Sequence, residues 1–339
     1  MRLALYCPVY GYYEKEEDRI GPNGDFYTSV SVGNLFGELL AFQFAEWLAP
    51  CQSGTRPVQI VEAGAHSGHL ARDILMWFRR YRPELFDSLH YIIIEPSATR
   101  QKWQSDSLAD FHHKIVWSSR ITHHASRING IIFANELLDA MPVRRFGWNA
   151  QKREWFEWGV TLKDNNLVWT GLEQQIPKMP ETFALNGELL ALLPHGFTFE
   201  TCDEAETWWR DAARGLERGR LVTIDYGMTA EELISPERKD GTLRGYRRHQ
   251  ATSDLLANPG EQDLTAHVNF SALVKNGEAN GLKTEKFETQ AQFLTQIFSR
   301  AWKNAGGEEW STLRARQFQT LTHPEHLGYS FRVLVQSRD

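Results

Sequence analysis

Three short segments of the sequence each place residues that could bind a small molecule at the end of a predicted strand. The first is residues 62–68, Glu-Ala-Gly-Ala-His-Ser-Gly, which closes the apolar strand expected at 58–62. Its two glycines would let the backbone approach a ligand closely, and the carboxylate of Glu62 can accept hydrogen bonds. We therefore expect a ligand-binding turn that leads from this strand into a helix.

The spacing of the glycines in this turn distinguishes between cofactors. A dinucleotide-binding loop has glycines at the first, third and sixth positions of its motif, whereas Gly64 and Gly68 occupy the first and fifth positions. Hydride transfer with NAD is therefore disfavoured. Adenosylmethionine carries no phosphate, so its loop needs a close approach of the backbone to the amino-acid part rather than an anion site.

The second segment contributes a carboxylate, Glu95, at the end of the strand expected at 91–95. A carboxylate in this place can accept hydrogen bonds from both hydroxyl groups of a ribose, as the acidic residue of nucleotide-binding folds does. The alternative is that Glu95 caps the helix that follows. Of the two interpretations we favour ribose binding.

The third segment is residues 135–142, Asn-Glu-Leu-Leu-Asp-Ala-Met-Pro, after a strand at 130–134. Glu136 and Asp139 lie three positions apart and would share a face if the turn is helical. Paired carboxylates in a cleft can hold a guanidinium group by charge-assisted hydrogen bonds and keep its nitrogen aligned with a methyl donor. A capping arrangement with Asn135 explains the same spacing equally well.

The elements that must position these segments alternate between strands and helices, which predicts an α/β fold with a parallel sheet covered on both faces. The carboxyl ends of parallel strands meet at one edge of such a sheet, so the three segments should lie together there. Helices are expected at about 290–303 and 308–321. The strands are expected at 58–62, 91–95, 130–134, 221–225, 283–289 and 331–336.

Three further elements follow from local patterns. Apolar residues recur at helical spacing over 35–48, with Asn34 placed to cap the start, which predicts an amphipathic helix. Alternating side chains around two turns predict an antiparallel hairpin at 144–172, inserted into the main fold. The segment 203–217 is expected to be helical and to be closed by Gly219.

Composition limits the function further. Lysine and arginine total 37 against 43 aspartates and glutamates, a formal charge of −6, which gives no support to nucleic-acid binding. Cys7, Cys51 and Cys202 are odd in number and widely spaced, which argues against disulfides and a structural zinc site. No apolar run approaches the ~20 residues that cross a bilayer. We therefore expect a cytoplasmic chain without membrane insertion.

Eight segments, spread over nearly the whole chain, share the order and spacing of one known family. They are 10–13 (Tyr-Gly-Tyr-Tyr), 20–21 (Ile-Gly), 24–28 (Gly-Asp-Phe, with Thr28), 36–40 (Phe-Gly-Glu-Leu-Leu), 135–142, 225–227 (Asp-Tyr-Gly), 241–246 (Gly-Thr-Leu-Arg-Gly-Tyr) and 258–268. Together they resemble MidA-type methyltransferases, a family related to the mitochondrial complex I assembly factor that methylates a protein arginine.

The resemblance implies a Rossmann-like class I methyltransferase fold with a seven-stranded, mostly parallel sheet. It also implies S-adenosyl-L-methionine as cofactor and, as partner, an arginine-containing protein such as a respiratory-complex subunit. Residues 1–50 would form a loop and helix over the cofactor site, and 51–339 the methyltransferase domain, with insertions at about 144–200 and 228–270. The cofactor would be bound by Asp25, Phe26, Thr28, Glu62, Gly64, Gly68, Glu95 and Asn135.

On this interpretation Glu136 and Asp139 orient the guanidinium group of the acceptor, since an arginine is nearly always protonated. The proton lost on methylation needs an acceptor, and His249 and His267 are weaker candidates for that role. Histidines in such segments more often satisfy backbone partners than act in catalysis.

The chain departs from the family in the glycine turn. The family commonly reads Glu-x-Gly-Pro-Gly-x-Gly, and this chain has Ala65 and His66 where proline and glycine are usual. We expect the ring of His66 to point away and the backbone to fit the cofactor. Two alternatives stay open: a small-molecule methyltransferase on the same fold, and a non-catalytic assembly or binding factor whose cofactor turn His66 blocks.

Overall fold

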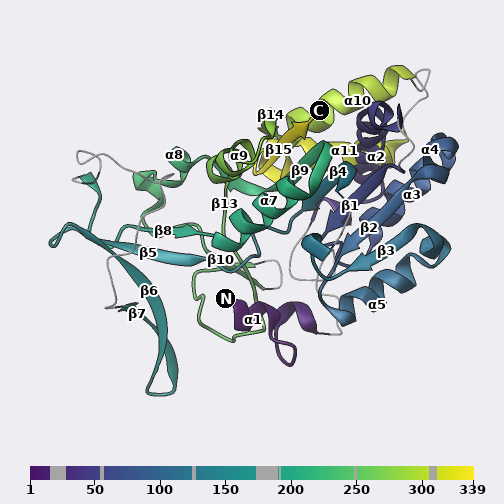
Figure 1. The fold of residues 1–339 in the computed structure, drawn as a ribbon. Coiled ribbons are helices and arrows are strands. Elements are labelled where there is room, and N and C mark those ends of the chain that lie inside the picture. The colour runs from purple at the N-terminus through teal and green to yellow at the C-terminus, as the bar shows by residue number, and fades with distance from the viewer. Residues whose placement is uncertain are drawn as a thin grey trace.

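The computed structural model describes residues 1–15, 28–53, 57–123, 127–172, 190, 192–247, 250–304 and 311–339. Figure 1 shows a broad sheet with helices packed on it, a long hairpin arm that projects away from the sheet, and the N-terminal helix below. Among the described helices, none is both long and apolar enough to span a bilayer.

The main sheet runs in the order β14-β15-β9-β4-β1-β2-β3, and the short strand β13 adds to β9. Only β15 runs antiparallel to its neighbours β9 and β14, so the expected mostly parallel sheet is confirmed, with seven strands in this order and β13 as an eighth. The strands are β1 (Gln59–Ala63), β2 (His90–Ile94), β3 (Ile115–Ser118), β4 (Ile128–Asn135), β9 (Leu216–Met228), β13 (Val268–Asn269), β14 (Lys283–Thr289) and β15 (Phe331–Arg338).

Helices cover both faces of this sheet because its central strands are apolar on both sides. All eight residues of β4 are buried, and its side chains divide between two separate hydrophobic clusters. One cluster contains α2 (Leu35–Leu48), α3 (His69–Tyr81), α4 (Pro83–Ser88), α10 (Gln290–Asn304) and α11 (Thr312–Thr322). The other contains α7 (Asp203–Gly215) and α9 (Phe270–Ala279).

Helix α2 lies where it was expected, but the prediction that it is amphipathic is wrong. Only Glu38 and Glu46 of its residues are not buried. The helix is enclosed because it packs against α3, α10 and α11 as well as the sheet, and a helix in that position is apolar on nearly every side. Asn34 does not cap the backbone; its amide donates to Oε1 of Glu38 at 2.7 Å.

Two other boundaries differ from the sequence-based expectation. Helix α7 ends at Gly215, and Gly219 lies inside β9 rather than closing the helix. A Cβ on Gly219 would stand 1.8 Å from the carbonyl oxygen of Gly130, so the close pairing of β9 with β4 requires glycine there. Strand β3 was not predicted, since it has four residues, only one of them buried.

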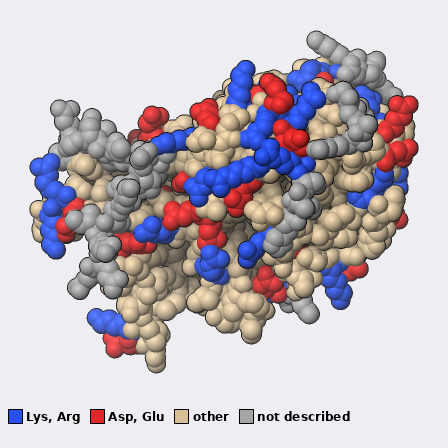
Figure 2. All heavy atoms as spheres, in the orientation of Figure 1, with Lys and Arg blue, Asp and Glu red and all other residues tan. Residues whose placement is uncertain are grey.

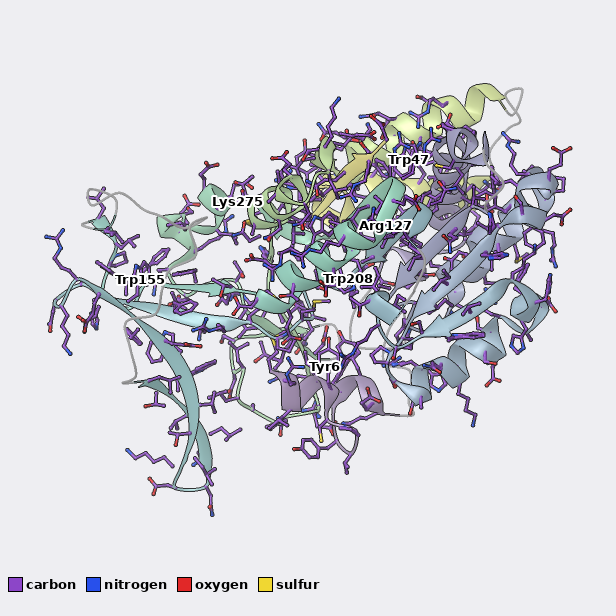
Figure 3. All side chains as sticks on the ribbon, in the orientation of Figure 1. Tyr6, Trp47, Arg127, Trp155, Trp208 and Lys275 are labelled. Carbon is purple, nitrogen blue, oxygen red and sulfur yellow. The ribbon has the colours of Figure 1, made fainter. Side chains whose placement is uncertain are left out.

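The predicted hairpin at 144–172 is confirmed and belongs to a second sheet, in the order β7-β6-β5-β8. Its base is held by an aromatic cluster in which Trp148 and Trp155 lie 5.0 Å apart between ring centres; Trp155 is labelled in Figure 3. The strands are β5 (Arg144–Asn149), β6 (Glu154–Lys163), β7 (Asn166–Leu172) and β8 (Thr198–Thr201).

Smaller elements complete the described chain. A third sheet has the order β11-β10-β12, and several single-turn helices join the larger elements. The strands of this sheet are β10 (Arg244–Arg247), β11 (Gln250–Thr252) and β12 (Asp263–Thr265). The remaining α-helices are α1 (Arg2–Tyr6), α5 (Ala98–Ser107) and α8 (Ala230–Leu233). The short helical turns are η1 (Tyr12–Glu14), η2 (Val30–Val32), η3 (Ala49–Ser53), η4 (Ala109–Lys114), η5 (Ile121–His123), η7 (Pro236–Arg238) and η8 (Pro324–Gly328).

The charged side chains on one face of the molecule are mixed in sign. Figure 2 shows a band of lysine and arginine side chains across the upper middle of this face, with aspartates and glutamates between and beside them. Among the ion pairs of the described residues, Nε of Arg220 lies 2.9 Å from Oε2 of Glu285. Interspersed charges of this kind are typical of a solvated surface.

The central strands should carry much of the stability, which a matched pair of substitutions can test. Leu221 on β9 is fully buried, whereas Leu162 near the tip of the arm is 66% exposed. We expect Leu221→Ala to lower the free energy of unfolding by about 2–5 kcal/mol, because it leaves a cavity, and Leu162→Ala to lower it by less than about 1 kcal/mol. Urea denaturation of both variants measures the difference; equal losses would contradict this account of the core.

Candidate functional site

The glycine turn after β1 adopts the backbone conformation that its sequence predicts. Gly64 and Gly68 have φ angles of 73° and 81°, in the left-handed region that glycine occupies without strain. A Cβ on Gly64 would lie 2.8 Å from the side chain of Leu137, on the third of the three segments. The turn is therefore packed directly against the segment that carries the paired carboxylates.

His66 closes this turn although it is not glycine. Its φ angle is 47°, a conformation that is uncommon for a residue with a Cβ, which explains why glycine is usual at this position. The ring packs edge-on against Trp103, and the carbonyl oxygen accepts a hydrogen bond from Nε2 of Gln104 at 3.0 Å. Burial lowers the pKa of His66 to about 3, so the ring is neutral.

Glu62 is buried at the carboxyl end of β1, where the sequence places it. The hydroxyl of Tyr91 donates to its Oε2 at 2.6 Å. Burial raises the pKa of Glu62 to about 7, and the hydrogen bond from Tyr91 opposes that rise. The carboxyl group can therefore change its charge near neutral pH.

Glu95 does not cap α5, because the hydroxyl of Ser97 accepts from the backbone N–H of Arg100 and caps the helix. The Oε1 of Glu95 instead accepts a hydrogen bond from the backbone N–H of Ser97 at 2.9 Å. Its Oε2 accepts from Nε2 of Gln104 at 3.1 Å. Burial raises the pKa of the Glu95 carboxyl. Each oxygen of a carboxylate has two lone pairs, so these bonds leave room for ribose hydroxyls, and ribose binding stays a prediction.

The turn after β4 is not helical, so Glu136 and Asp139 do not share a helical face. Glu136 has a left-handed φ of 52°, and its Oε1 accepts hydrogen bonds from the backbone N–H of Ser29 at 2.9 Å and from Nδ2 of Asn135 at 3.1 Å. Burial raises the pKa of Glu136 to about 8. Asn135 thus supports Glu136 directly rather than capping a helix.

The structure adds two carboxyl groups that the sequence did not single out. Asp225 on β9 and Asp263 on β12 act on the charge of Asp139, and together with Glu136 these residues form what we call the acidic cluster. Burial, then Asp225, Asp263 and Glu136 in that order, raise the pKa of Asp139 well above its usual range. The sequence held one clue, since Asp225 also ends a predicted parallel strand.

The N-terminal segment lies across the site and joins its two halves. The hydroxyl of Tyr13 donates to Oδ1 of Asp263 at 2.7 Å, while Nε of Arg100 on α5 donates to the carbonyl oxygen of Tyr13 at 2.9 Å. The hydroxyl of Tyr6 donates to the carbonyl oxygen of Ala140 at 3.0 Å, and Figure 3 shows Tyr6 on the side of α1 that faces the main body. Neither tyrosine hydroxyl was predicted to be part of the site.

The other predicted residues have mixed outcomes. Thr28 is buried, and its Oγ1 accepts a hydrogen bond from the backbone N–H of Ser31 at 3.1 Å. Burial lowers the pKa of His267 to about 4, which makes it a weak base, and its assignment as proton acceptor stays a prediction. Asp25, Phe26 and His249 lie outside the described residues.

These residues suit a nucleoside linked to an amino acid. The glycine turn leaves space for a close backbone approach, and Glu62 and Glu95 offer carboxylates on neighbouring strands. Within the described chain, Oδ1 of Asn135 is buried and has no hydrogen-bond partner, so it can accept from an ammonium group. The acidic cluster next to it suits a cation.

The burial of Glu136 predicts how stability depends on pH. Because the pKa of Glu136 rises from 4.5 to about 8 on folding, its stabilising effect is complete below pH 4.5 and is lost as the pH rises to about 8. Glu136→Gln keeps an oxygen that can accept from Ser29 but cannot ionise. At pH 8 we expect the free energy of unfolding of Glu136→Gln to exceed that of the native chain by on the order of a few kcal/mol, measured by urea denaturation.

The control for this experiment is Glu231→Gln, a substitution of an exposed glutamate on α8. It should leave the native pH dependence unchanged. If Glu136→Gln and the native chain lose stability equally between pH 5 and about 8, the charge of Glu136 is not the cause.

Comparison with known proteins agrees with this geometry. Residues 39–288 match a family model described as "Putative S-adenosyl-L-methionine-dependent methyltransferase". The protein arginine methyltransferase NDUFAF7 of Danio rerio, named as mitochondrial, is 30% identical over 98% of this chain and 81% of its own. Its Drosophila melanogaster homologue is 25% identical over 99% of this chain and 79% of its own.

The cytoplasmic location expected from the sequence is contradicted, because these relatives are named as mitochondrial proteins. The three cysteines are free, as expected, but a reducing environment does not by itself identify a compartment. The error lay in inferring a location from the cysteines and from the lack of a membrane-crossing apolar run, because neither feature identifies a compartment.

A solved structure shares the whole arrangement. A Burkholderia thailandensis protein crystallised with S-adenosyl-homocysteine superimposes with a TM-score of 0.81, at 29% identity, over 99% of this chain and 86% of that one. The family model covers well over half of the sequence, and the structural match covers 99% of the chain. The chain therefore belongs to the S-adenosyl-L-methionine-dependent methyltransferases of the MidA type, and S-adenosyl-L-methionine is its cofactor.

Proposed function

We propose that this chain transfers a methyl group from S-adenosyl-L-methionine to the guanidinium group of an arginine in a protein. The observation that carries the proposal is the acidic cluster, in which Asp139, Asp225 and Asp263 are buried and Glu136 is partly buried. An arginine stays protonated even when buried, and it pairs well with carboxylates. The relatives named protein arginine methyltransferase support the same acceptor.

The cofactor would be held by the ends of β1, β2 and β4. The backbone at Gly64 and Gly68 would contact its amino-acid part, Asn135 would accept a hydrogen bond from its ammonium group, and Glu95 would accept from the ribose hydroxyls. When bound, the cofactor supplies a methyl group on a positively charged sulfur. Glu62 lies on β1, directly before the glycine turn, and can ionise to balance the positive charge of the sulfur.

Glu136 and Asp139 would orient the acceptor. The side chain of Glu136 is fixed by Ser29 and Asn135, which leaves its Oε2 available for one N–H of a guanidinium group. Alignment of the nitrogen with the methyl group supplies much of the rate enhancement in such a displacement. A neutral small-molecule acceptor would have no need for so many buried acids.

The N-terminal segment would cover the cofactor, with 1–50 as a covering unit and 51–339 as the methyltransferase domain with insertions at about 144–200 and 228–270. Two contacts support this division: the hydroxyl of Ser97 donates to Oε2 of Glu14 at 2.8 Å, close to Glu95, and Ser29 holds Glu136. We further propose that the acceptor protein is of the respiratory-complex type.

The separate roles proposed for Glu95 and Glu136 can be tested by calorimetry and a methyl-transfer assay. We expect Glu95→Ala to lose most of its affinity for S-adenosyl-L-methionine, since the ribose loses its acceptor. Glu136→Ala should bind the cofactor as the native chain does and fail to methylate arginine in a protein substrate. Equal loss of cofactor binding in the two variants would contradict these roles.

His66 provides a second test, because a glycine would adopt its left-handed backbone at lower cost. We expect the native chain to bind S-adenosyl-L-methionine and S-adenosyl-homocysteine saturably in a calorimetric titration, and His66→Gly to bind within about tenfold of it. Binding by His66→Gly alone would mean that the ring blocks the site, and would favour a non-catalytic binding factor.

A further inference from the structure

Asp225 supports the turn that carries Glu136 and Asp139, although neither the proposed cofactor site nor the acceptor pair includes it. It lies on β9, next to β4, and is fully buried. Its Oδ2 accepts hydrogen bonds from the backbone N–H groups of Leu138 at 2.8 Å and Leu137 at 3.2 Å. Hydrogen bonds from amides to a carboxylate are charge-assisted, so they fix the path of the turn firmly.

The turn needs this support because of its backbone conformation. The left-handed φ of Glu136 is strained for a residue with a Cβ, and such strain persists only where the surroundings enforce it. The N–H of Glu136 donates to the carbonyl oxygen of Ile224 at 2.9 Å, and the next two N–H groups bond to Asp225. Consecutive residues of β9 therefore hold the backbone of the turn that carries Glu136.

Asp225 also contacts the second acid of the acceptor pair. Leu138, whose N–H donates to Asp225 at 2.8 Å, directly precedes Asp139, and both acids are buried. Asp225 therefore acts on Asp139 and raises its pKa, and one proton shared by the two acids would remove the repulsion between them. Two acids this close in a buried site cannot both ionise readily.

We propose that Asp225 is a positioning residue of the acceptor site, which holds the Asn135–Asp139 turn through its backbone amides and shares one proton with Asp139. The inference rests on the proposed function, because that function assigns Asp139 to the acceptor. The coupling does not depend on that function: the charge of Asp139 changes with that of Asp225, so neither acid titrates alone.

The carboxyl pair can accept the proton that methylation releases. Methylation of a guanidinium nitrogen forms an N–C bond and breaks the C–S bond, whose electron pair stays on sulfur, and one N–H proton must leave. A guanidinium that arrives beside Asp139 replaces the shared proton as partner of the two carboxylates, and that proton goes to solvent. The ionised pair then accepts the N–H proton that methylation releases.

The surroundings of the pair consist of acids and phenols rather than bases. Asp263 and Glu136 act on Asp139, and Tyr226 responds to both acids of the pair. Their proximity opposes a second ionisation and favours a shared proton while no cation is bound. The groups that face the pair are Glu136 on its own turn, Asp263 on β12, Tyr6 and Tyr13 from the N-terminal segment, Tyr226 on β9 and Tyr246 on β10, with Arg244 close enough to act on Tyr246.

The test is a carbon-13 NMR titration of the full chain, labelled at the aspartate carboxyl carbons. Asp139→Asn and Asp225→Asn assign the two signals, and Asp106→Asn, at an exposed position on α5, is the control. In the native chain we expect both signals to titrate in the same two steps, with one step near pH 7. Each variant should leave a single step for the remaining acid, at lower pH for Asp139 in Asp225→Asn.

A second readout reports on the positioning role. The amide protons of Leu137 and Leu138 donate to Asp225, so their chemical shifts should follow its titration and should become insensitive to pH in Asp225→Asn. The proposal is overturned if the two acids titrate independently, each at an unchanged midpoint when the other is replaced. Should Asp225→Asn fail to fold, Asp139→Asn alone decides the outcome.

Calorimetry with S-adenosyl-L-methionine on the same samples keeps the two proposals apart. A native chain with a coupled titration and no cofactor binding would overturn the proposed function and leave the carboxyl pair in place. Cofactor binding together with independent titration would overturn the pair and leave the proposed function standing.

Discussion

The burial of carboxyl groups at the carboxyl ends of the parallel strands is the constraint on which the site depends. A carboxylate that leaves water loses several kcal/mol of solvation unless donors replace the water. Asp225 receives backbone N–H groups, Glu136 receives the backbone N–H of Ser29 and the side-chain amide of Asn135, and Glu62 receives the hydroxyl of Tyr91. Each acid is thus bonded to a different element, and these bonds hold the elements together around the site.

These contacts explain why the N-terminal segment and the insertions converge on one place. Tyr13 supplies a hydroxyl to Asp263, which belongs to the small sheet of the second insertion. Arg100 on α5 holds the backbone of Tyr13, so the cofactor side and the acceptor side share one connecting segment. Because Asp139, Asp225 and Asp263 are buried, the electrostatic interactions between them are stronger than in water.

The sequence predicts the main sheet well because a buried parallel strand and a glycine turn are both local patterns. Glu62, Gly64, Gly68 and Glu95 could be placed from their positions relative to strand ends alone. Asp263 and Tyr13 could not, since their contact joins residues 250 positions apart, and no local pattern encodes it. The helical conformation predicted around Glu136 is wrong, because the spacing of two carboxylates does not reveal a left-handed φ, while its role in the site stays a prediction.

The same acids that suit a cation reduce the stability of the empty protein. Glu62, Glu136, Asp139 and Asp225 all have a raised pKa for the same first cause, burial, so each favours the folded state less as the pH rises. The two hydrophobic clusters on the faces of the sheet must offset that loss. A bound cation reverses it, because the positive charge replaces the proton that each buried acid would otherwise need. Stability and acceptor binding are therefore linked through the same carboxyl groups. The free energy gained by burying the two hydrophobic clusters allows the protein to keep so many acids in its site.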